Sequence, residues 1–188
     1  MKHLKLFYGS SYDRGLIHLL KIWSQIKDKH PQAELHIAYG WDLFDRAFQN
    51  NPERQNWKER VNKLMEQPGI THHGRVGKDK LQKIRKECGI WAYPTEFTEI
   101  NCITALEAQR DGCVPVVMAV AALKETVGSG IKLEGDIYDP EIRKQYLAEL
   151  LKLMGNKELW STEVHKAKEF AKSYDWSLIA KQWEAVFS

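Results

Sequence analysis

The chain has 188 residues, of which 43% are hydrophobic and 28% charged, a composition typical of one globular domain. Its 28 Lys and Arg against 25 Asp and Glu give a net charge of +3, too small to favour nucleic acid or a membrane surface as a partner. No stretch approaches the roughly 20 apolar residues of a membrane span. Cys88, Cys102 and Cys113 lack paired metal-ligand spacing and are typical of reduced thiols. We expect one cytoplasmic domain over residues 1–188, without a metal site.

The chain opens with an apolar strand over residues 4–8, followed by the polar loop 9–15 and an amphipathic helix. Such a loop before a helix N-terminus suits phosphate, because free N–H groups and the helix dipole favour anions. Asp13 is the expected N-cap, and Arg14 adds a positive charge. From the loop alone, the simpler interpretation is a tight turn with a solvated Arg14.

Two adjacent histidines, His72 and His73, follow further along and invite a metal or catalytic interpretation. Neighbouring residues on a strand point to opposite faces, so at most one of them can serve a given site. Asp79 is the expected cap of the helix that follows. The elements expected in this part of the chain are strands over 34–39 and 70–73 and helices over 41–46, 52–66 and 79–86.

Two glutamates mark the central segment, in which a buried strand over 89–93 leads through a loop into a helix beginning near Asn101. Glu99 precedes the helix and Glu107 lies two turns inside it, so their carboxylates lie about 10 Å apart along the axis. Between them lies a helix N-terminus that favours a phosphate. Carboxylates suit sugar hydroxyls because each accepts several hydrogen bonds.

The rest of the chain continues the alternation of strands and helices. We expect strands over 114–118 and 131–133 and helices near 142–153, 158–173 and 176–187. The last helix has an apolar face, for which packing into the core is the favoured interpretation. Alternating elements predict a Rossmann-like, doubly wound parallel α/β sheet, in which ligands bind beyond the strand C-termini. The loops after Tyr8, His73 and Tyr93 would then share one edge.

A family resemblance rests on the central segment, which reads YPTEFTEINCITALEA at 93–108 and DGCVPVV at 111–117. This pattern resembles the donor-site signature of retaining glycosyltransferases of the two-domain GT-B fold (glycosyltransferase group 1, family 4-like). It departs from that signature at Ile100-Asn101-Cys102, where the family has Gly-Phe-Gly. The backbone approach to the phosphates is the feature that this departure affects.

The resemblance implies a role for each candidate residue, with a UDP-, GDP- or ADP-sugar as substrate and no metal or other cofactor. Glu99 would orient the transferred sugar, as a catalytic residue but not as the nucleophile. Glu107 would accept hydrogen bonds from the ribose, beside the base contacts of Arg75 and Val76. The diphosphate would be held by Ser10, Ser11, Arg14, Asn101, Cys102 and Ile103.

The resemblance also implies that the chain is the C-terminal, donor-binding half of the fold. Activity would require an N-terminal acceptor domain in cis or in trans, to which the C-terminal helix commonly crosses back. On this interpretation the chain is either a separated domain or one subunit of a split enzyme. Two alternative functions remain open. One alternative is a non-catalytic nucleotide-sugar-binding module, and the other is half of a sugar-nucleotide epimerase. Against the epimerase, the sequence offers no acid–base cluster beyond the glutamate pair.

Overall fold

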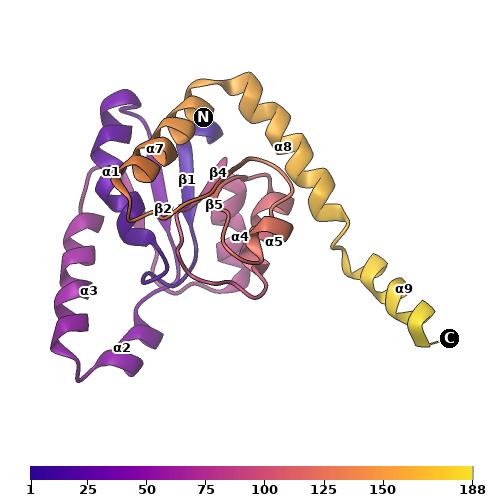
Figure 1. The fold of residues 1–188 in the computed structure, drawn as a ribbon, viewed down its shortest axis with the longest axis horizontal. Helices are drawn as coiled ribbons and strands as arrows, with labels where there is room; N and C mark the ends of the chain where they lie inside the picture. The colour runs from indigo at the N-terminus through magenta and orange to yellow at the C-terminus, as the bar shows by residue number, and fades with distance from the viewer. Residues whose placement is uncertain (188) are drawn as a thin grey trace.

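The computed structural model describes residues 1–187, which form a parallel α/β sheet covered by helices on both faces (Figure 1). The six strands are arranged in the order β3-β2-β1-β4-β5-β6, and every pairing is parallel. This confirms the expected Rossmann-like class. The strands are β1 (Lys5–Tyr8), β2 (Glu34–Ile37), β3 (Ile70–His72), β4 (Ile90–Tyr93), β5 (Val114–Met118) and β6 (Ile131–Leu133).

The helices fall into two layers because the chain reverses its direction across the sheet after β3. α3 and α7 pack beside α1 on one face, whereas α4 and α8 pack beside α5 on the other. Their bounds are η1 (Lys2–Leu4), α1 (Leu16–Lys29), α2 (Asp42–Phe48), α3 (Pro52–Met65), α4 (Lys78–Glu87), α5 (Ile103–Asp111), α6 (Leu123–Thr126), α7 (Pro140–Gly155), α8 (Lys157–Lys172) and α9 (Trp176–Phe187).

The core lies around the central strands. Every residue of β4 and of β5 is buried, as expected for parallel strands covered on both faces. Trp23 of α1, with no exposed surface, packs into this core. None of the described helices in residues 1–187 has the length and apolar character needed to cross a membrane.

Two expected helix caps were wrong. α1 begins after Gly15, and Asp13 instead accepts a 2.6 Å hydrogen bond from the Ser11 hydroxyl within the preceding loop. α4 begins after Gly77, which leaves Asp79 inside the first turn, where its negative charge interacts favourably with the helix dipole. The helix expected from Asn101 starts two residues later, at Ile103.

α9 has the predicted bounds but not the predicted packing. None of its described residues is buried, and Trp176 and Phe187 are 82% and 80% exposed. Figure 1 shows the cause: α8 carries the chain past the sheet, so α9 extends away from the domain. The expectation that this helix packs into the core was wrong, and its apolar face is left open to solvent.

Candidate functional site

The loops after β1 and β4 meet at the C-terminal edge of the sheet. Gly15, the residue before α1, has φ of +100°, a conformation that favours glycine. A Cβ atom at this position would lie 2.2 Å from the carbonyl oxygen of Pro94. The start of α1 can therefore rest directly on the loop after β4 only because residue 15 has no side chain.

A hydrogen-bonded cluster joins these two loops around Glu99. The Tyr93 hydroxyl donates to Glu99 Oε1 at 2.7 Å, and Arg14 donates to the same oxygen at 3.3 Å. The Ser10 hydroxyl lies 3.2 Å from that of Tyr93. Burial raises the pKa of Tyr93, so the phenol keeps its proton and remains a donor at neutral pH. The structure thus brings together Ser10, Arg14 and Glu99, which the sequence analysis had selected separately.

Arg14 retains access to solvent within this cluster. Its side chain is 34% exposed, whereas that of Glu99 is 10% exposed. The guanidinium carbon lies 3.8 Å from the centre of the Phe97 ring, a cation–π contact. Arg14 thus presents a positive charge, fixed from two sides, to the edge of the sheet.

The N-terminus of α5 lies on the same loop as Glu99. No side-chain hydrogen bond caps it. The amide of Ala105 donates to the Cys102 carbonyl at 3.0 Å, which leaves the amides before it as the donors open to an anion. Burial raises the pKa of the Cys102 thiol to about 11, which keeps this residue neutral beside the helix N-terminus. Asn101 and Ile103 are exposed. This arrangement can accept an anion next to Arg14.

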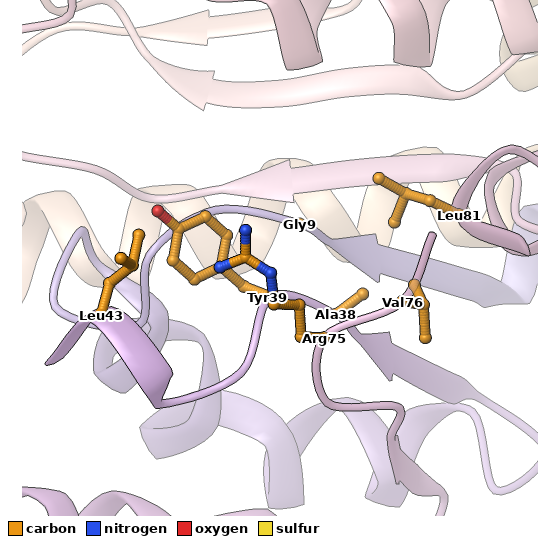
Figure 2. Close-up of a pocket in the computed structure, with 7 residues that line it drawn as sticks. All are labelled: Gly9, Ala38, Tyr39, Leu43, Arg75, Val76 and Leu81. Atoms are coloured by element: carbon orange, nitrogen blue, oxygen red, sulfur yellow. The ribbon is translucent and has the colours of Figure 1, made fainter. Parts of the chain in front are cut away.

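A pocket of ≈ 200 Å³ opens beside the cluster, and Gly9 connects the two. Arg75 and Val76 line it (Figure 2), and their contact with a base stays a prediction. Sequence reasoning missed the pocket's other side chains, which come from the loop after β2 and from α2 and α4. They are Ala38, Tyr39, Leu43 and Leu81.

Two predicted residues have other partners. The Ser11 hydroxyl donates to Asp13, as described above. Glu107 lies neither in the cluster nor among the residues that line the pocket. Its Oε2 atom is 3.0 Å from Arg85 Nη1, and its side chain is 35% exposed. The diphosphate role of Ser11 and the ribose role of Glu107 stay predictions.

The two adjacent histidines point to opposite faces, as the strand geometry predicts. His72 Nε2 lies 2.6 Å from the Tyr12 hydroxyl, and His73 Nε2 lies 3.0 Å from His36 Nδ1. Burial lowers the pKa of both. Within residues 1–187, no three or more His, Cys, Asp or Glu side chains gather in a way that could hold a metal ion.

The family model described as "Glycosyl transferases group 1" matches residues 4–173. The chain belongs to this family. No curated protein matches it in sequence. The match spans the loops after β1, β3 and β4, which contain the candidate site residues.

Solved structures support the fold assignment. The chain aligns with the pneumococcal O-GlcNAc transferase GtfA, solved with UDP and GlcNAc, at 15% identity and a TM-score of 0.75. The alignment covers 98% of this chain and 35% of GtfA. Sucrose-phosphate synthase from Thermosynechococcus elongatus gives 19% identity, a TM-score of 0.74 and coverages of 97% and 44%.

A third structure matches over most of both chains. The C-terminal domain of the glycosyl transferase group 1 protein LpcC from Francisella tularensis has 15% identity and a TM-score of 0.66, covering 90% of this chain and 84% of that domain. The chain therefore has the fold of one GT-B half. It spans about a third of the length of GtfA.

Proposed function

We propose that this domain binds a nucleoside-diphosphate sugar and supplies the donor half of a retaining glycosyl transfer. The main support is the 3.3 Å contact between Arg14 and Glu99, which places a cation from the loop after β1 beside a carboxylate from the loop after β4. A sugar nucleotide needs both chemistries side by side, a cation for the diphosphate and a carboxylate for the sugar hydroxyls. Membership of the glycosyl transferases group 1 family supports the same assignment.

The site orders the ligand along the edge of the sheet. The base would enter the pocket beside Arg75 and Val76. The diphosphate would lie between Arg14 and the amides at the start of α5, where no side chain caps the helix. The transferred sugar would reach Glu99, whose Oε1 atom is already occupied by Tyr93 and Arg14, so Oε2 is the atom placed to accept from sugar hydroxyls.

The proposed chemistry relies on the domain's own positive groups. As the glycosidic bond breaks, negative charge grows on the leaving diphosphate, and fixed donors stabilise it in the transition state. Arg14 and the amides near Asn101 and Ile103 are the donors in this position, and the proposed step uses no metal ion. Glu99 holds the sugar in the reactive orientation, which affects rate more than affinity.

We further propose that transfer requires an N-terminal acceptor domain, in cis or in trans, and that this chain alone is inactive. The exposed apolar face of α9 supports a missing partner, since Trp176 and Phe187 would otherwise stay in water. The acceptor is a carbohydrate or another hydroxyl compound, and the reaction takes place in the cytoplasm.

Binding can be tested by calorimetry with UDP-, GDP- and ADP-sugars. We expect weak binding of one class and its loss in Arg14→Ala. Arg54→Ala is the matched control, because Arg54 also stacks on a phenylalanine, Phe48 at 4.9 Å, but belongs to α3. Absence of binding across the panel would overturn the proposal. Adding the acceptor domain and an acceptor then separates a glycosyltransferase, which transfers sugar, from a binding module, which does not.

A further inference from the structure

A buried arginine links the two carboxylates of α5. Arg85 of α4 has a side chain that is only 3% exposed. Its Nε atom donates to Asp111 Oδ2 at 2.8 Å, and its Nη1 atom lies 3.0 Å from Glu107 Oε2. The three side chains run from the interior to the surface: that of Asp111 is 1% exposed and that of Glu107 is 35% exposed.

Asp111 alone is sufficient to pair with the buried charge of Arg85. A buried guanidinium must be paired, and Asp111 is the equally buried partner. Asp111 is itself fixed, since it also accepts from Gln82 and Arg110, both at 3.3 Å. The contact to Glu107 is therefore additional to what the burial of Arg85 requires, and its effect falls on the more exposed carboxylate.

The contact with Arg85 restricts the orientation of the Glu107 side chain. Side chains on a helix lean toward its N-terminus, and the N-terminus of α5 faces the edge of the sheet where the candidate site lies. Glu107 has many side-chain rotamers when free, and an ion pair to a buried, immobile arginine selects among them. Holding Oε2 leaves Oε1 to accept a further hydrogen bond, on a side chain that is 35% exposed.

We propose that Arg85 is a positioning residue for ribose recognition, which fixes Glu107 so that its free oxygen accepts from a ribose hydroxyl. The inference rests on the proposed function, because it needs a nucleotide in the site. A purely structural Arg85 would affect the stability of the domain but not its preference between ribose and deoxyribose. That preference is therefore the quantity to measure.

The test is a set of dissociation constants from ligand-observed NMR for UDP, GDP and ADP and for their 2′-deoxy and 3′-deoxy counterparts. For the wild type we expect one deoxy form to bind about tenfold more weakly than its parent, the loss of a charge-assisted hydrogen bond. Glu107→Gln and Arg85→Lys should both reduce this ratio to about threefold or less. Lysine can pair with Asp111 but lacks the planar fork that spans both carboxylates.

Two further proteins keep the test decisive. Arg110→Lys is the control, because Arg110 contacts Asp111 but is 53% exposed and has no contact with Glu107. It should keep the wild-type ratio. If Arg85→Lys fails to fold, the double variant Arg85→Met, Asp111→Leu replaces the buried pair by apolar side chains of similar volume and leaves Glu107 without its partner.

The outcomes separate the two levels of the account. No nucleotide binding by the wild type overturns the proposed function together with this inference. Binding without any ribose preference overturns the role of Glu107, and therefore of Arg85. A wild-type preference that survives intact in the folded Arg85 variants overturns the inference alone and leaves the donor site in place.

Discussion

Glu99 is held in position by the protein before any ligand is present. Tyr93 and Arg14 both donate to its Oε1 atom, and its backbone carbonyl accepts from the amide of Ala122 at 3.1 Å. A carboxylate fixed in this way loses little conformational entropy when it binds a sugar. More of the free energy of each hydrogen bond is therefore available to orient the substrate.

Glu99→Ala should distinguish the sugar from the rest of the donor. We expect affinity for the bare nucleoside diphosphate to change by less than about twofold, and affinity for the sugar nucleotide to fall about tenfold, as calorimetry would measure. Glu96→Ala is the control, since Glu96 lies on the same loop but accepts instead from the Tyr138 hydroxyl. Equal losses for both ligands would place Glu99 at the phosphate or the ribose.

His18 gives the fold a dependence on pH. Its side chain is 2% exposed, and neither ring nitrogen has a hydrogen-bond partner in the described chain. Burial, with the charges of Arg143 and Lys21, lowers its pKa to about 4. In the unfolded chain His18 takes up a proton near pH 6.5, whereas in the folded chain it stays neutral down to about pH 4. The folded state is therefore destabilised as pH falls from about 6.5 to about 4.

The size of this effect can be measured by urea unfolding between pH 7 and pH 4. We expect His18→Phe, which keeps a ring against Tyr138, to remove up to about 3 kcal/mol of the loss in free energy of unfolding. His72 and His73 contribute with the same sign and remain in both proteins. An unchanged pH dependence in the variant would show that His18 does not titrate in this range.

At the scale of elements, sequence patterns predicted the strands better than the helix starts. Apolar runs such as β4 and β5 identify buried parallel strands directly. The caps of α1 and α4 were missed because Asp13 and Asp79 fit the rule by composition, whereas the backbone turns at Gly15 and Gly77. Which residue begins each helix depends on how the preceding loop packs, and the spacing of residues in the sequence does not indicate that packing.

The candidate site divides in the same way. Ser10, Arg14 and Glu99 were selected through the family resemblance, because the loop before α1 alone favoured a tight turn with a solvated Arg14. They follow the ends of β1 and β4, and the structure brings them together. Tyr93 was missed because it ends an apolar strand and has the composition of core. The contact between Arg85 and Glu107 left no local signal, since it joins two helices separated by a strand.

The junction of α1 with the loop after β4 can be tested with a pair of glycines. Gly15→Ala places a Cβ 2.2 Å from the Pro94 carbonyl at a positive φ, and should lower the free energy of unfolding by about 2 kcal/mol or more. Gly77→Ala is the control, because a Cβ there meets nothing within 4 Å and should cost less than about 1 kcal/mol. Thermal unfolding would measure both, and equal losses would contradict the proposed close approach.

At the scale of the whole molecule, α9 is separate from the folded core. A chain ending at Asp175 should keep its melting temperature within about 2 °C, because no described residue of α9 is buried. The same truncation should reduce association with the acceptor domain, measured by sedimentation. A large fall in melting temperature would mean that α9 packs on this domain in solution.

The most direct test of the donor site is an NMR titration of the backbone amides with the nucleoside-diphosphate sugar that binds most tightly. We expect the shifts to concentrate in residues 9–15, 74–77 and 99–104, the three loops at the C-terminal edge of the sheet. Shifts confined elsewhere, for example to the groove between α1 and α7 lined by Ile22, Gln25 and Arg143, would contradict it.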